Sequence, residues 1–136
     1  MNLGFIGTGK ITSSVITGIC KSSIKYRKIY ISSRNKKVSK QLSKKFKKII
    51  ILKNNQKIVD HSNWVFLAVT PNVGNKIIKK LRFRSSQTII SFISTIDLSS
   101  LKKMIKVKSK IVRAIPLPPI SLKKGPVPIC PPNKKV

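Results

Sequence analysis

The chain has 136 residues, which is enough for one domain with its own core, and no apolar run reaches the roughly 20 residues that a membrane span needs. Thirty Lys and Arg against two Asp and Glu give a formal net charge of +28. Because Asp60 and Asp97 are the only carboxylates, the composition excludes paired-carboxylate catalysis and a carboxylate metal site.

The positive charge is spread over every segment and does not form one block. Glu is absent while Lys, Ile, Asn and Ser are all abundant, so we attribute the lysines to a bias in coding composition. We therefore expect only non-specific binding of nucleic acid, through its phosphates, and do not expect nucleic acid to be the main partner.

The first predicted element is a strand that runs into a glycine turn and then a helix. Residues 3–6 are mainly apolar, Gly7-Thr8-Gly9 follows at once, and residues 11–19 carry apolar side chains at helical spacing. Gly7 permits the tight turn, Gly9 leaves room for a pyrophosphate, and the helix N-terminus offers free N–H groups. Thr12 replaces the third glycine of this fingerprint. A turn that binds no ligand is the alternative, but the strand-turn-helix order favours a nucleotide site.

The following segments alternate between strands and helices. The pattern predicts strands over 28–32, 49–52, 64–69, 88–92 and 110–115, and helices over 38–46, from Pro71 to about 81, and over 98–105, with a loop at Asn54-Asn55. Continuous apolar strands separated by helices predict a mainly parallel sheet covered on both faces. The expected fold class is α/β, a single Rossmann-like doubly wound domain.

The character of the chain changes after Ile115, because seven of the eight prolines lie beyond it. Proline cannot continue a helix or a central strand. We therefore expect residues 1–115 to form the NAD(P)-binding domain and residues 116–136 to form an extended tail or linker.

The end of the second strand indicates which cofactor is bound. NAD sites place an Asp or Glu there, whereas this sequence has Ser33-Arg34-Asn35. Arg34 can hold a 2′-phosphate, and Ser32 or Ser33 can donate to it. The alternative is that Arg34 is one more surface cation and the cofactor is NAD; the pattern favours NADP.

The remaining chemically active side chains suggest no further site. Cys20 and Cys130 form no C-x-x-C motif, so neither a zinc site nor a disulfide is expected, and two free thiols suit a reducing cytoplasm. His61 is expected on the surface or at a helix cap.

The two carboxylates and the aromatic residues also have structural interpretations. Asp97 is expected to cap the helix that begins at residue 98, and Asp60 to pair with a nearby lysine. Trp64 and Phe66 belong to an apolar strand and are expected in the core.

Six short motifs together resemble the pyrroline-5-carboxylate reductase family, in the family's order and across nearly the whole chain. They are Gly4-Phe5-Ile6-Gly7-Thr8-Gly9, Ser33-Arg34-Asn35, Asn55-Gln56 with Val59-Asp60, Phe66-Leu67-Ala68-Val69-Thr70-Pro71, Gln87-Thr88-Ile89-Ile90-Ser91, and Val112-Arg113-Ala114-Ile115-Pro116. The resemblance implies an NADP-dependent oxidoreductase that transfers a hydride from NADPH to a cyclic imine, as in proline biosynthesis.

The resemblance also implies the residues of the cofactor site. They are Gly7, Thr8, Gly9, Lys10, Ile11, Ser33, Arg34, Asn55, Ala68, Val69, Thr70 and Pro71. Candidates on the substrate side are Ser94, Thr95 and Pro116, where Ser94 and Thr95 could equally be simple loop hydroxyls. No catalytic side chain and no metal is assigned, because the hydride comes from the cofactor.

Three departures from the family pattern concern the nicotinamide and substrate region. Thr70 stands where the family has lysine, Ser94-Thr95 where it has Ala-Gly, and residues 115–119 where it has Met-Pro-Asn-Thr-Pro. The substrate of such a side branch need not be pyrroline-5-carboxylate.

The family also carries a C-terminal helical domain for dimerisation and closure of the substrate pocket, and this chain ends at Val136. We expect a truncated reductase, weakly active or inactive alone, unless a homodimer or a helical domain from another chain completes it. The alternatives are a non-catalytic nucleotide-binding remnant or a basic nucleic-acid-binding protein.

Overall fold

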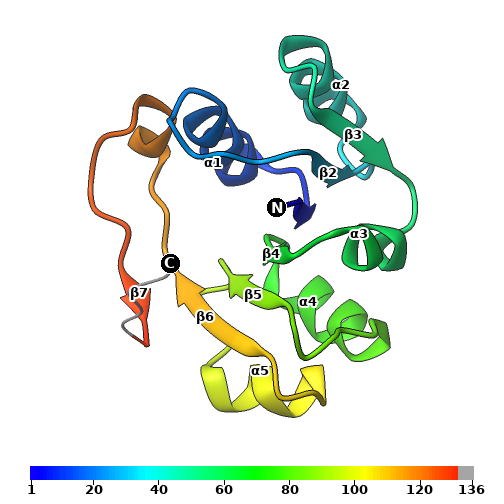
Figure 1. The fold of residues 1–136 in the computed structure, drawn as a ribbon. Helices are drawn as coiled ribbons and strands as arrows, with labels where there is room; N and C mark the ends of the chain where they lie inside the picture. The colour runs from blue at the N-terminus through cyan, green and yellow to red at the C-terminus, as the bar shows by residue number, and fades with distance from the viewer. Residues whose placement is uncertain (132–136) are drawn as a thin grey trace.

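The computed structural model of the protein describes residues 1–131. Its strands are β1 (Leu3–Ile6), β2 (Ile29–Ser32), β3 (Ile49–Leu52), β4 (Trp64–Leu67), β5 (Thr88–Ser91), β6 (Lys110–Ala114) and β7 (Ile129–Cys130). Its helices are α1 (Lys10–Cys20), α2 (Lys36–Lys45), α3 (Asn55–His61), α4 (Pro71–Ile77) and α5 (Leu98–Ile105), with 3₁₀ turns η1 (Ile78–Lys80) and η2 (Pro118–Leu122). Strands and helices therefore alternate, as the sequence predicts (Figure 1).

The strands form one sheet in the order β3-β2-β1-β4-β5-β6-β7. All neighbours from β3 to β6 are parallel, and only β7 is antiparallel to its neighbour β6. The chain moves outward from β1 to β3, then returns to the other side of β1 and continues from β4 to β6. The predicted α/β Rossmann-like fold is confirmed, and its topological switch point lies between β1 and β4.

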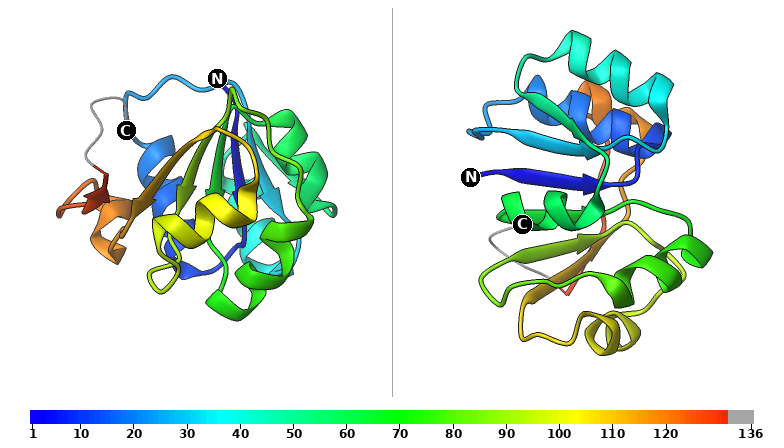
Figure 2. Two further views of the ribbon diagram at one scale, coloured as in Figure 1. Left: turned by 90° about the horizontal axis from the view of Figure 1, so that it is seen from below. Right: turned by 90° about the vertical axis from the view of Figure 1, so that its right-hand side faces the viewer.

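Helices cover both faces of the sheet, and β1 shows why the sequence requires this (Figure 2). Successive side chains of a strand point to opposite faces. Leu3 and Phe5 pack with α1 and α2 on one face, whereas Ile6 packs with α3, α4 and α5 on the other. Phe5 stacks on Phe66 of β4 with ring centroids 4.3 Å apart, and Phe66 is buried. Phe66 and the partly buried Trp64 thus pack in the core, as predicted.

Polar side chains cap the N-termini of α2, α3 and α5. Asn35 accepts a hydrogen bond from the Val38 N–H and caps α2, and Asp97 accepts one from the Ser100 N–H, 2.7 Å away, and caps α5 as predicted. The loop predicted at Asn54-Asn55 includes Asn54 but not Asn55: the Asn54 side chain accepts hydrogen bonds from the N–H groups of Gln56 and Lys57 and caps α3, a helix that the sequence does not predict and that begins at Asn55.

The proline-rich segment differs from the extended linker that the sequence predicted. Residues 118–122 form η2, which packs on α1 so closely that a Cβ added to Gly18 would lie 2.4 Å from the Ile120 carbonyl oxygen. Residues 129–130 then add β7 to the sheet edge, where a strand next to proline is tolerated. Within residues 116–131 the segment is therefore packed on the domain, and residues 132–136 lie outside the described part.

No helix within residues 1–131 is both long enough and apolar enough to cross a membrane.

Candidate functional site

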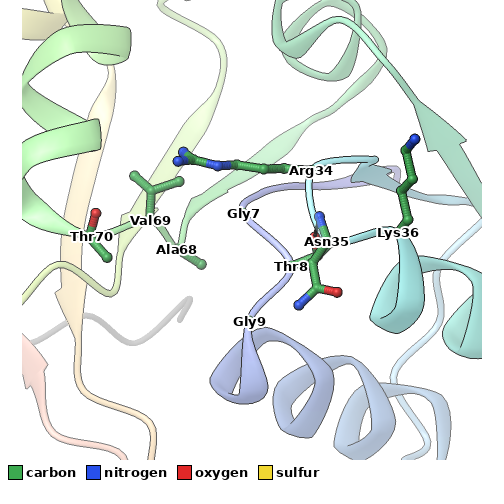
Figure 3. Close-up of a pocket in the computed structure, with 9 residues that line it drawn as sticks. All are labelled: Gly7, Thr8, Gly9, Arg34, Asn35, Lys36, Ala68, Val69 and Thr70. Atoms are coloured by element: carbon green, nitrogen blue, oxygen red, sulfur yellow. Dashed lines mark hydrogen bonds between the residues drawn. The ribbon is translucent and has the colours of Figure 1, made fainter.

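An open cleft of about 640 Å³ lies at the carboxyl ends of the strands, at the switch point between β1 and β4. Parallel α/β sheets bind ligands at this position. Three turns form it, those that follow β1, β2 and β4 (Figure 3). The lining residues are Gly7, Thr8, Gly9, Arg34, Asn35, Lys36, Ala68, Val69 and Thr70.

Gly7 forms the turn at the bottom of the cleft, and no other residue type fits there. Its φ is +104°, a conformation that L side chains rarely adopt. A Cβ at this position would also lie 2.1 Å from the carbonyl oxygen of Ala68. The turn after β1 is thus pressed against the turn after β4, and this contact brings the two halves of the cleft together.

Gly9 has a different role, because it faces free space. It is the N-cap of α1, its φ of −84° is open to any residue, and a Cβ built on it meets no atom within 4 Å. Among the residues that the structure describes, no side chain caps α1, and the first turn of this helix holds no acidic residue. The N–H groups of this turn therefore remain available as hydrogen-bond donors. Because Gly9 has no side chain, the main chain faces the cleft directly, which is the arrangement that binds a diphosphate at a helix N-terminus.

Three hydrogen bonds connect the glycine turn to β2 and the turn that follows it. The Gly7 N–H donates to Ser32 Oγ (3.1 Å), Thr8 Oγ1 donates to the Ser32 carbonyl (3.3 Å), and the Asn35 N–H donates to Thr8 Oγ1 (3.3 Å). Ser32 is only 5% exposed. The expectation that Ser32 could donate to a 2′-phosphate is wrong, because its hydroxyl lies beneath the turn and supports it.

Arg34 and Lys36 give the cleft its charge, and none of the lining residues is acidic. Both side chains are exposed. Figure 3 shows the Arg34 side chain extending across the mouth of the cleft toward Val69, whereas Lys36 points away from it. A guanidinium at the end of β2 is suited to a phosphate and offers no acceptor for a ribose hydroxyl.

The cleft brings together seven of the predicted cofactor residues: Gly7, Thr8, Gly9, Arg34, Ala68, Val69 and Thr70. The others do not line the cleft. Lys10 and Ile11 are in the first turn of α1, Ser33 is a half-buried residue after β2, Asn55 opens α3, and Pro71 opens α4. Among the substrate-side candidates, Ser94 and Thr95 are exposed after β5 and Pro116 is buried after β6.

Sequence reasoning missed two lining residues, Asn35 and Lys36. Asn35 belongs to a motif that the sequence analysis singled out, but it was given no part in the site. Lys36 had no distinguishing signal among thirty cations. Its position at the first residue of α2 places it at the cleft.

Side chains outside the cleft have structural partners. Hydrogen bonds from Ser100 hold the pKa of Asp97 below its ordinary value, and the cations of Arg113 and Lys103 contribute. Asp60 accepts from Gln56 Nε2 (2.8 Å) in place of the predicted lysine. His61 is an exposed residue whose Nδ1 lies 2.7 Å from the Lys57 carbonyl oxygen, as expected of a surface histidine.

The cysteines supply no reactive group at the cleft. Cys20 and Cys130 are both free thiols, and neither lines the cleft. Burial raises the pKa of the Cys20 thiol, which keeps it protonated at neutral pH. Within residues 1–131, no three His, Cys, Asp or Glu residues are grouped so that they could hold a metal ion.

A family model described as NADP oxidoreductase, coenzyme F420-dependent, matches residues 2–95. The fold is similar to three solved pyrroline-5-carboxylate reductases. The enzyme from Streptococcus pyogenes is 22% identical with a TM-score of 0.80, over 99% of this chain and 51% of that one. The Plasmodium falciparum enzyme, solved with NADP bound, is 23% identical with a TM-score of 0.81, over 100% and 49%. The Coxiella burnetii enzyme is 21% identical with a TM-score of 0.85, over 98% and 52%.

These similarities confirm the resemblance to pyrroline-5-carboxylate reductases at the level of the fold. The chain spans about half the length of the solved reductases that it matches.

Proposed function

The chain belongs to the NADP oxidoreductase family described as coenzyme F420-dependent, and on this premise we propose that the cleft after β1, β2 and β4 binds NADPH as the cofactor half of an imine reductase. The observation that carries the proposal is the glycine turn. Gly7 is required by its backbone conformation and its contact with Ala68, whereas the position of Gly9 serves only to keep space open beside the N-terminus of α1.

Each of the three turns that form the cleft would bind a different part of the cofactor. Main-chain N–H groups at Gly9 and the start of α1 would hold the diphosphate. Arg34 would hold the 2′-phosphate, which distinguishes NADP from NAD. Ala68, Val69 and Thr70 would border the nicotinamide, because they follow β4 on the other side of the switch point.

Arg34 supports NADP for a reason of charge and of hydrogen bonding. The cleft offers no carboxylate to accept from a ribose 2′-OH, and its only charged lining side chains are Arg34 and Lys36. Asn35 lies between them in the sequence, and its side chain already accepts the hydrogen bond that caps α2. Exposed Lys36 adds positive charge at the same end of the cleft.

NADPH bound here would supply a hydride, and we propose a cyclic imine of the pyrroline-carboxylate class as the acceptor. The residues that line the cleft include no His, Asp, Glu, Cys or Tyr that could supply the proton that the imine nitrogen needs. The proton and the cover over the substrate would come from water, from a second copy or from a further helical domain. We therefore expect low turnover from residues 1–136 alone.

Replacing Arg34 with alanine tests the cofactor preference. Loss of charge-assisted hydrogen bonds to the 2′-phosphate, worth roughly 1.5–3 kcal/mol, should weaken NADPH binding about 10- to 100-fold. NADH affinity should change less than about threefold, since NADH has no such phosphate. Titration followed by energy transfer from Trp64, the only tryptophan, measures both affinities.

Lys37→Ala is the matched control, because Lys37 is an exposed cation of α2 that does not line the cleft. It should leave both affinities nearly unchanged. Equal weakening by the two variants would mean that NADPH responds to the overall charge, and the assignment of Arg34 would be wrong.

A further inference from the structure

Arg113 occupies an unusual place for a charged residue, because it lies inside the sheet. It is in β6, paired with Ser91 of β5 on one side and with Cys130 of β7 on the other, and it is half-buried. Its Nη2 donates a hydrogen bond to the main-chain oxygen of Ser94. The side chain thus reaches from β6 to the loop between β5 and α5.

This loop, residues 92–97, is anchored from below by two buried side chains. Ile93 is 2% exposed and Ile96 is 5% exposed. A Cβ added to Gly74 of α4 would lie 2.8 Å from Ile93 Cδ1, so the loop packs closely on the helix that Thr70 of the cleft begins. The exposed residues of the loop are its tip, Ser94-Thr95, and Asp97, whose side chain caps α5.

Without Arg113, the tip would have few contacts of its own. The hydrogen bonds within the loop and to β4 lie at Ile93, Ile96 and Phe92, and the hydrogen bond found at the tip among residues 1–131 is the one from Arg113. The guanidinium therefore holds the loop tip, which neither isoleucine side chain anchors.

Arg113 is a costly way to hold this loop if stability alone is considered. Its Nε is buried and has no hydrogen-bond partner within the described residues. A buried donor without an acceptor costs free energy, and a half-buried charge loses hydration. The attraction to the Asp97 carboxylate offsets only part of these costs, and a neutral side chain would lose the hydrogen bond to Ser94; we therefore take the position of the loop tip as the property that the arginine provides.

We propose that Arg113 is a positioning residue for the nicotinamide half of the proposed cofactor site. Because β5 is parallel to β4 and lies beside it, the loop after β5 is next to Ala68, Val69 and Thr70 at the carboxyl ends of the strands. Arg113 holds the Ser94-Thr95 tip at these strand ends, where the hydroxyls and main chain of the tip would border the nicotinamide and the hydride acceptor. The inference rests on the proposed function.

The test compares two ligands in the variant Arg113→Met. NADPH contains the nicotinamide half, whereas adenosine 2′,5′-bisphosphate contains only the 2′-phosphate end. Arg113→Met should weaken NADPH binding about tenfold and leave the bisphosphate affinity within about twofold of the wild type, measured by calorimetry. Arg113→Lys, which keeps the charge and one donor group, should recover part of the lost NADPH affinity and decides the question if the methionine variant does not fold.

Arg84→Met is the matched control. Arg84 also donates to main-chain oxygens, those of Asp60 and Ser62. However, it precedes β5 and so lies at the amino-terminal ends of the strands, away from the cleft. It should leave the ratio of the two affinities unchanged.

Two outcomes separate this inference from the proposed function. An unchanged ratio in Arg113→Met and Arg113→Lys, with wild-type protein binding both ligands, would overturn the role of Arg113 alone. Wild-type protein that binds neither ligand would overturn the proposed function, and the role of Arg113 with it.

Discussion

Gly7→Ala is expected to destabilise the folded protein by about 3 kcal/mol. A positive φ costs an L residue roughly 1–2 kcal/mol, and forcing a methyl group against main chain adds roughly 1–3 kcal/mol. Both terms apply at Gly7, where φ is +104° and the Ala68 oxygen would lie 2.1 Å from the new Cβ. Urea unfolding followed by the fluorescence of Trp64 measures the free energy of unfolding.

Gly125→Ala separates the two terms. Gly125 also has a positive φ, +86°, but the nearest atom to an added Cβ is a side-chain carbon of Pro119 at 3.9 Å. Its loss should be limited to the conformational cost alone, roughly 1–2 kcal/mol. If the two variants lose equal stability, the contact between the turns after β1 and β4 is not as close as the structure shows.

Gly9→Val is expected to weaken NADPH binding at least about 100-fold while the fold stays intact. The valine side chain would enter the space that the diphosphate needs, and loss of several phosphate hydrogen bonds corresponds to roughly 3 kcal/mol or more. The φ of −84° is accessible to valine and no atom lies within 4 Å of the new Cβ, so the melting temperature should fall by only a few degrees.

Gly9→Ala provides a graded comparison for this variant, since one methyl group fills less of the same space. Its NADPH affinity should lie between those of the wild type and Gly9→Val. Wild-type affinity in Gly9→Val would show that the diphosphate does not rest on this turn.

The sequence predicts the strands and the glycine turn well because their signals are local. The apolar runs at 49–52 and 64–67 cannot be exposed, and Gly7-Thr8-Gly9 stands directly between a strand and a helix. Asp97 was identified as a cap for the same reason, since its carboxylate acts on backbone only three residues away.

The features that the sequence did not predict depend on contacts between distant residues. Ser32 and Ser33 are adjacent hydroxyls, and only the hydrogen bond from Gly7 shows that Ser32 supports the turn. The packing of η2 on Gly18 joins residues about 100 positions apart, which proline content alone cannot indicate. Arg113 lies in one of the motifs that resemble the reductase family, but only its contact with Ser94 shows what its side chain does.

The most direct test of the account is the melting temperature of the wild-type protein in about 1 mM NADPH, compared with the same concentration of inorganic tripolyphosphate. Binding at 100 times the dissociation constant would add about 2.7 kcal/mol of stability and raise the melting temperature by roughly 10 °C. Tripolyphosphate reports general attraction of anions to a chain of net charge +28. We predict a clearly larger rise with NADPH, absent in Gly9→Val; a melting temperature that NADPH raises no more than tripolyphosphate would contradict a cofactor site at the glycine turn.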